Sequence, residues 1–317
     1  MSTDDLSGPV IVNEVVWTPT PPRPKFQHNY ARHLIFFGLA FFTTSFTPVW
    51  DVFWGALFRG VNPLPLFTWG NFVLGLPYSL TVLFILSAHE FGHYFACRYY
   101  NVDATLPYFL PLPLSPSGTL GAVIRIREAF PSKAALFDIG VAGPIAGFVV
   151  LVPFLYWGIS MSEVGPISNA PGTIYFGEPF LWKIFEWIHF GPIPDGMDVF
   201  VHPVGLAAWW GMLATALNLL PFGQLDGGHI TYAVFGRRAS WLSFATLVTV
   251  VSLTMFTVSW TMFAVMMTAM AFFFGFRHPR VADEHEPLDP TRRLVAIWAL
   301  MIFILCFTPV PLDMIGP

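Results

Sequence analysis

Long apolar runs decide what this chain can fold into. Hydrophobic residues make up 55% of the sequence and charged residues only 11%, against about a quarter charged in soluble domains. Stretches near the 20 residues that a helix needs to cross a membrane recur along the chain. They lie at about residues 33–54, 72–99, 134–161, 203–220, 241–276 and 294–307. We therefore predict a polytopic membrane protein without a soluble domain of useful size.

The run 241–276 is too long for one crossing. Its 36 residues would extend about 54 Å as a single helix, whereas a hydrocarbon core is about 30 Å thick. We predict two spans that turn near residues 257–260, followed by a shorter span at 294–307. The fold class is then an all-α polytopic membrane protein with about seven transmembrane helices.

Lysine and arginine indicate the orientation of these spans, because cytoplasmic loops hold an excess of both. With the N-terminus inside, 13 of the 15 Lys and Arg residues fall in inside segments, and only Arg59 and Lys183 fall outside. A single span over 241–276 would weaken this bias. We expect a cytoplasmic N-terminus, an outside C-terminus and a prokaryotic plasma membrane location. The first span should stay as an anchor, because the Pro-rich stretch at 18–25 resembles neither a signal nor a transit peptide.

An H-E-x-x-H motif lies near the end of the run 72–99. Positions i and i+4 share one face of a helix, so His89 and His93 can bind one zinc ion, while Glu90 lies beside it to activate water. The alternative is a pair of buried histidines and a buried glutamate with structural partners. Ionisable residues at membrane depth are costly and usually functional, which favours the metal. The orientation places this motif near the cytoplasmic side.

A catalytic zinc usually has three protein ligands, so one more donor is needed. Cys97 continues the i, i+4 series, but it lies more than a turn beyond the metal on a straight helix, and a small buried residue explains it better. Asp226 is the better candidate, because it follows the run 203–220 and reaches the same depth. Pro221 and three glycines break the helix there, and non-helical backbone at that depth must line a cavity. The alternative is a helix-capping Asp226 in an ordinary interfacial turn.

The motif pair resembles the site-2 protease family of intramembrane zinc metalloproteases. H-E-x-x-H late in one span is followed in a later span by N-x-x-P-x-x-x-L-D-G, here residues 218–227. The resemblance implies one zinc per chain on His89, His93 and Asp226. It also implies Glu90 as general base and Asn218 beside the scissile peptide, where it steadies the developing oxyanion.

The interval 104–128 between the motifs is expected to form a hairpin. Residues 118–127 alternate in the manner of a strand after a Pro-rich stretch. In the family, a re-entrant β-hairpin here is thought to receive the substrate as an added strand, and we place substrate contacts at Gly118, Gly121 and Pro221. The alternative is a plain cytoplasmic hairpin.

The resemblance also implies partners. The expected substrate is a single-pass membrane protein in the lipid bilayer, often a regulator trimmed first by an upstream protease. The net charge of -4 gives no nucleic-acid signature. A metal-ion transporter is the chief rival, because intramembrane His, Glu and Asp residues also suit ion passage, but a conduit should place ionisable residues at several depths. A non-catalytic scaffold is the third possibility.

The predicted organisation has four parts. A cytoplasmic Pro-rich tail at 1–33 precedes the first span and outer loop at 34–71, the metalloprotease core at 72–236 and the C-terminal spans at 237–317. Within the core, the outer segment 160–200 carries four aromatic residues that either anchor an amphipathic helix at the membrane surface or gate substrate entry. His229 either orients a ligand or faces lipid headgroups.

Overall fold

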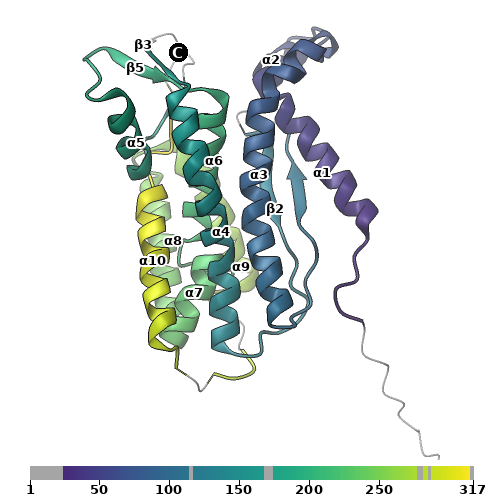
Figure 1. Cartoon of the computed structure of the whole chain (residues 1–317), viewed down its shortest axis with the longest axis vertical. Helices are drawn as coiled ribbons and strands as arrows, with labels where there is room; N and C mark the ends of the chain where they lie inside the picture. The colour runs from purple at the N-terminus through teal and green to yellow at the C-terminus, as the bar shows by residue number, and fades with distance from the viewer. Residues whose placement is uncertain (1–23, 114–116, 168–173, 277–280, 285–286, 315–317) are drawn as a thin grey trace, which may run out of the picture.

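The protein is mainly helical (Figure 1). The computed structural model describes residues 24–113, 117–167, 174–276, 281–284 and 287–314. Most of the Pro-rich stretch 18–25, and Arg23, Arg277 and Arg280 from the orientation argument, lie outside these residues.

Two long helices form the centre of the molecule. α3 covers Trp69–Tyr99 and α4 covers Lys133–Ser160. The hydroxyl of Thr68 caps α3 by accepting the backbone N–H of Asn71, and the hydroxyl of Ser132 caps α4 by accepting that of Ala135. The other helices of the described residues are shorter. They are α1 (Tyr30–Ser45), α2 (Trp50–Phe58), α5 (Phe180–Phe190), α6 (Pro203–Asn218), α7 (Asp226–Phe235), α8 (Ala239–Leu253), α9 (Thr261–Phe274) and α10 (Pro290–Cys306).

The number of clear membrane spans is smaller than the number predicted from the sequence. Among the described residues, α3 and α4 are long and apolar enough to cross a membrane, and a third span is added if α1 and α2 are taken together. These two helices are bent by 50° at their junction. The run 33–54 is therefore not one straight helix. Pro48 explains the break, because proline lacks a backbone N–H and clashes with the preceding turn, and the residues around it form the 3₁₀ helix Thr47–Val49 (η1).

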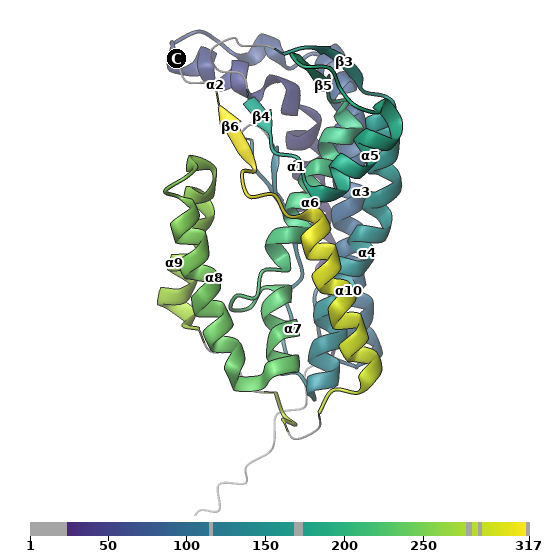
Figure 2. The same cartoon turned by 90° about the vertical axis from the view of Figure 1, so that its left-hand side faces the viewer.

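The run 241–276 is broken close to where its length predicts a turn. α8 ends at Leu253, the 3₁₀ helix Val258–Trp260 (η4) follows, and α9 begins at Thr261. The two helices return on each other and stand at one edge of the molecule (Figure 2). Two further 3₁₀ helices, Leu64–Leu66 (η2) and Gly236–Arg238 (η3), lie in connections.

A β-hairpin lies between α1 and α3, in the interval predicted for it (Figure 1). β1 (Tyr108–Pro111) pairs antiparallel with β2 (Thr119–Val123), and a further bridge joins Ala104 to Ile126. The rings of Phe37 on α1 and Phe109 on β1 lie 5.1 Å apart. The hairpin is therefore packed against α1, mainly through β1.

The described residues of the outer segment 160–200 follow the C-terminal end of α4 and contribute strands to two small sheets. β3 (Glu163–Pro166) pairs with β5 (Met197–Phe200), and β4 (Ile174–Phe176) pairs with β6 (Leu312–Met314). α5 is the helix that carries the four aromatic residues considered in this segment. Trp182 is buried and Trp187 is exposed. The two faces of α5 therefore differ as an amphipathic helix requires.

α4 crosses its neighbours where side chains are small. A Cβ added at Gly158 would overlap the backbone of Gly205 on α6, so the two helices touch through their main chains. α10 closes the bundle against α4 and α6, and the bidentate pair of Arg292 with Asp138, at 2.6 and 2.9 Å, fixes its N-terminal end. The main apolar core lies between these helices and includes Phe137, Leu151, Leu155, Ile159, Trp209, Met212 and Ile302.

Candidate metal centre

His89 and His93 lie one turn apart on the same face of α3, and both are buried. This face is turned towards α4, where glycines recur at positions 140, 143 and 147. A Cβ at Gly143 would overlap the imidazole of His93, and one at Gly147 would lie 3.1 Å from the Cβ of His89. The absence of side chains on this strip of α4 makes the room in which the two imidazoles lie.

Asp226 reaches the same place from a different part of the chain. α6 ends at Asn218, a non-helical segment follows, and Asp226 is the first residue of α7. The segment turns back tightly: Gly223 has a φ of +53°, and a Cβ at Gly227 would overlap the carbonyl of Leu219. The local sequence thus brings a single carboxylate to the histidines from the first turn of a short helix.

The three side chains converge on one point. The Nε2 atoms of His89 and His93 are 3.1 Å apart, and the Asp226 Oδ2 lies 3.2 Å from the first and 3.3 Å from the second. Donors about 2.0–2.1 Å from a tetrahedral zinc are roughly 3.3–3.4 Å from one another. The spacing of these three atoms therefore suits a metal ion without rearrangement, and the group can hold one.

The orientation of His93 supports the same conclusion. Its Nδ1 lies 2.6 Å from the carbonyl oxygen of Ile139 on α4, and because a carbonyl can only accept, Nδ1 carries the proton. In the neutral ring, Nε2 then presents a lone pair to His89 and Asp226. Neutral imidazole whose other nitrogen donates to a carbonyl is the usual form of a metal-binding histidine.

Glu90 and Asn218 lie beside this cluster. Glu90 is buried at 4% exposure, and its Oε2 has no hydrogen-bond partner. The backbone N–H of Ile124, just after β2, donates a hydrogen bond to its carboxyl group. The Nδ2 of Asn218 lies 3.3 Å from the Nε2 of His89. A buried carboxylate with an unused oxygen is costly unless a ligand or a reacting group supplies the partner.

Other predicted residues lie elsewhere or have structural contacts. Cys97 is buried in a separate apolar cluster with Tyr94 and Val102, away from the three metal-binding candidates. Gly118 and Gly121 both have positive φ, as hairpin glycines often do, and Gly118 packs against the end of α1. The carbonyl of Pro221 accepts from Thr246 on α8. Their predicted contacts with substrate stay predictions.

Sequence reasoning missed one contributor to the site. The carbonyl of Ile139 belongs to the backbone, so no side-chain pattern could reveal it. Gly143 contributes by the space it leaves, as part of the small-residue strip of Gly140, Gly143 and Gly147 at helical spacing. The rings of His229 and Phe130 lie 5.6 Å apart, and this contact does not decide between the two roles considered for His229, facing lipid headgroups or orienting a ligand.

The chain is similar to known proteins over the region that holds this cluster. Residues 77–263, more than half of the chain, match the sequence profile of peptidase family M50. The probable zinc metalloprotease EGY1 of Arabidopsis thaliana, a chloroplastic protein, is 32% identical over 169 residues, covering 52% of this chain and 30% of that protein. The chloroplastic EGY3 of Oryza sativa subsp. indica is 29% identical over 252 residues, covering 73% and 41%. The chain spans about a third of the length of these relatives.

Proposed function

Because this chain belongs to peptidase family M50, the site-2 protease family that its motifs indicate, we propose that it is an intramembrane zinc metalloendopeptidase. Its substrates would be single-pass membrane proteins, cut within or near the transmembrane segment. The relatives are named as probable zinc metalloproteases, and this activity is brought to the present chain by similarity over half its length.

One observation carries the proposal. Two imidazole nitrogens and a carboxylate oxygen lie within 3.1–3.3 Å of each other, on two buried histidines and a largely buried aspartate. Three acceptor groups do not converge in this way without a cation or shared protons between them. Two nitrogens and one oxygen form a donor set that zinc favours in hydrolases, where a fourth position stays open.

The surrounding residues have separate roles in this proposal. Zinc, when bound by His89, His93 and Asp226, supplies the Lewis acidity that activates water and polarises a peptide carbonyl. Glu90 takes a proton from the attacking water and later delivers it to the leaving amine, for which its unpaired Oε2 is available. Asn218 directs its amide N–H groups into the site and stabilises the developing oxyanion.

The hairpin would hold the substrate. A helical transmembrane segment must be unwound before its backbone can reach the metal, and an exposed strand edge can hold it extended. β2 contains Gly121, where an added Cβ would meet nothing within 4 Å, and it is followed directly by Ile124, whose backbone N–H donates to the Glu90 carboxyl group. A strand added along β2, with contacts at Gly118, Gly121 and Pro221, would therefore be led towards the proposed base.

The membrane arrangement is part of the proposal. The chain associates with a membrane through apolar helices, of which α3 and α4 are long enough to cross. We propose that α1, α6, α8, α9 and α10 complete a bundle of about seven spans, with the four predicted parts of the chain and the site near the cytoplasmic side. A prokaryotic plasma membrane stays a prediction, and the relatives are named as chloroplastic.

A metal-ion transporter is not favoured. A conduit needs ionisable side chains at several depths, whereas the cluster of metal-binding candidates found among the described residues is the single group of His89, His93 and Asp226. The free Oε2 of Glu90 next to that cluster has a use in hydrolysis and none in passive coordination.

Metal content and cleavage test the proposal together. Wild type purified in detergent without chelators should contain about one zinc per chain by elemental analysis, and His93→Ala should lose it. Glu90→Gln should keep the zinc and lose cleavage of a single-pass substrate in proteoliposomes. Cys97→Ala is the matched control, because Cys97 is buried on the same helix but outside the cluster. Zinc-free wild type, or full cleavage by Glu90→Gln, would contradict the proposal.

A further inference from the structure

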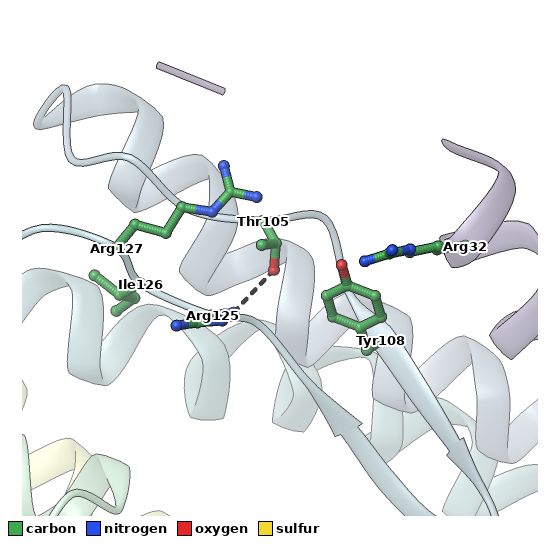
Figure 3. Close-up of a pocket in the computed structure, with 6 residues that line it drawn as sticks. All are labelled: Arg32, Thr105, Tyr108, Arg125, Ile126 and Arg127. Atoms are coloured by element: carbon green, nitrogen blue, oxygen red, sulfur yellow. Dashed lines mark hydrogen bonds between the residues drawn. The ribbon is translucent and has the colours of Figure 1, made fainter. Parts of the chain in front are cut away.

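A second site of a different kind lies at the base of the hairpin. A cavity of about 600 Å³ is lined there by two hydroxyl-bearing side chains, one isoleucine and three arginines (Figure 3). Arg32 comes from the first turn of α1, whereas the other lining residues come from the start of β1 and from the two chain segments that flank the hairpin. Those residues are Thr105, Tyr108, Arg125, Ile126 and Arg127.

The floor of this cavity is a rigid backbone frame. The N–H of Thr105 donates to the carbonyl of Arg125 at 3.0 Å, and the N–H of Arg125 returns to the Thr105 hydroxyl at 2.9 Å. The N–H of Arg127 donates to the carbonyl of Asp103 at 2.8 Å. Because residues two apart on an extended strand share a face, Arg125 and Arg127 are presented together. Figure 3 shows Arg32 reaching from α1 towards the hydroxyl of Tyr108.

The positive charge in this cavity is only partly compensated. Arg127 pairs with Asp103 at 3.3 Å, and the neighbouring Glu128 pairs with Lys25 at 2.8 Å. Within the ranges that the structure describes, the guanidinium groups of Arg32 and Arg125 have no carboxylate partner, and both residues are exposed. Two free guanidinium groups beside two hydroxyls form a strong acceptor-binding set, well matched to the oxygens of a phosphate.

The cavity also lies where the apolar surface of the molecule ends. From Leu34 onwards the outer face of α1 exposes large apolar side chains, whereas Arg32 and residues 25–30 are polar or aromatic. On α3, Tyr99 is 82% exposed at the helix end, two turns beyond the buried His93. Aromatic and basic residues at the end of an apolar surface are typical of the membrane–water boundary.

We propose that this cavity binds the phosphate of an anionic phospholipid headgroup. Arg32 and Arg125 hold the phosphate oxygens, the hydroxyls of Tyr108 and Thr105 complete the set, and the acyl chains lie along the exposed apolar face of α1. Basic pockets at the interface between membrane helices are suited to such headgroups. A bound lipid joins α1 to Arg125, which directly follows Ile124, the residue whose backbone N–H donates to Glu90. The proposal depends on membrane placement but not on proteolysis.

Lipid binding by the full chain in detergent tests this site. Native mass spectrometry and thermal shift should show saturable binding of phosphatidylglycerol and little binding of phosphatidylcholine. Each surface arginine contributes on the order of fivefold to the binding of anionic lipid, so the double variant R32Q/R125Q should bind about 25-fold more weakly. The matched control is R237Q/R238Q, which removes two exposed arginines that do not line the cavity.

Three outcomes would overturn the proposal. The first is an equal loss of lipid binding in R237Q/R238Q, which would mean unspecific attraction. The second is saturation of the cavity by inorganic phosphate at the concentration that phosphatidylglycerol needs, which would identify a soluble ligand. The third is binding of an acidic peptide with no response to lipid. Arg32 is exposed and its side chain has no described partner, so R32Q alone should fold and lose about fivefold if the double variant cannot be purified.

Discussion

The α3–α4 pair and the α8–α9 pair are both neighbouring apolar helices, but they are held in different ways. α3 and α4 touch where glycines leave no side chain between them, and the two histidines fill the space. α8 and α9 carry large apolar side chains that point outward, such as Val248, Met262 and Val265. In the α3–α4 contact, one added methyl group is expected to displace a histidine ring. On the outward face of α8 and α9, many different apolar residues could be substituted without such a clash.

Gly143→Ala should have the largest effect and is the most direct test of this contrast. The added methyl group overlaps the His93 imidazole, so the ring must leave the position fixed by Ile139. We expect zinc affinity to fall on the order of 100-fold, as for loss of an orienting contact, with cleavage lost in parallel. Competition with a fluorescent chelator measures the affinity.

Gly38→Ala is the control for this variant. A Cβ at Gly38 on α1 would meet nothing within 4 Å, so zinc affinity should not change. An unchanged affinity in Gly143→Ala would show that α4 does not determine the histidine geometry.

The α8–α9 pair should depend on its turn. Trp260 is 1% exposed and donates from Nε1 to the carbonyl of Pro309 at 2.7 Å, whereas Phe256 in the same turn is 83% exposed. Trp260→Ala should lower the free energy of unfolding by about 3 kcal/mol, because a large buried side chain and its hydrogen bond are lost. Phe256→Ala should change it by less than about 0.5 kcal/mol. Unfolding in detergent micelles measures both changes. Equal effects would mean that the buried Trp260 stabilises the turn no more than the exposed Phe256 does.

Loss of the ion pair between α10 and α4 should have an intermediate effect on stability. Arg292 holds Asp138 with two hydrogen bonds, and Arg292→Met leaves that carboxylate with Tyr100 as its remaining side-chain partner. A charged hydrogen-bonded pair of this kind contributes about 2 kcal/mol to the free energy of unfolding. Lys183→Met is the control, since its pair with Glu178 is long, at 3.6 Å, and largely exposed. A smaller effect for Arg292→Met than for Lys183→Met would mean that apolar packing alone holds α10.

The smallest effect is expected at the N-terminal edge, where Lys25 meets Glu128. The hydrogen bond from Lys25 lowers the pKa of Glu128 below its usual value of 4.5. The pair therefore stabilises the fold above about pH 4.5, and this contribution is lost as the pH falls below that value. Because both side chains are partly exposed, the stability difference between wild type and Glu128→Gln should be at most about 0.5 kcal/mol at pH 7 and close to zero at pH 3. A difference that grows on acidification would contradict the assignment.

The sequence predicted the parts of this molecule that depend on spacing. The H-E-x-x-H spacing requires only a helix for His89 and His93 to share a face. The depth of Asp226 followed from the order of apolar runs, and the structure brings its carboxylate to the histidines. The length of the run 241–276 likewise predicted a turn, which is found at η4.

Other features depend on contacts between distant segments, which no single-sequence pattern contains. The bend between α1 and α2 could have been inferred from Pro48, but the apolar run continues through it. The orienting carbonyl of Ile139 could not, since every residue has one. The cationic cavity brings Arg32 to Arg125 across 93 positions, and the residues appeared in the sequence only as separate inside charges.

Asp226 comes 133 residues after His93, and this separation sets the order in which the centre can be built. During synthesis, α3 and α4 can dock and orient His93 through Ile139 while the carboxylate is still inside the ribosome. A chain arrested before α7 has two ligands and no means of closing a three-ligand site. Binding of the metal by all three side chains is therefore a late event in biogenesis. It requires that α3, α4, α6 and α7 have all been made. Until Asp226 has been added, the two histidines alone cannot complete the three-donor cluster found in the folded chain.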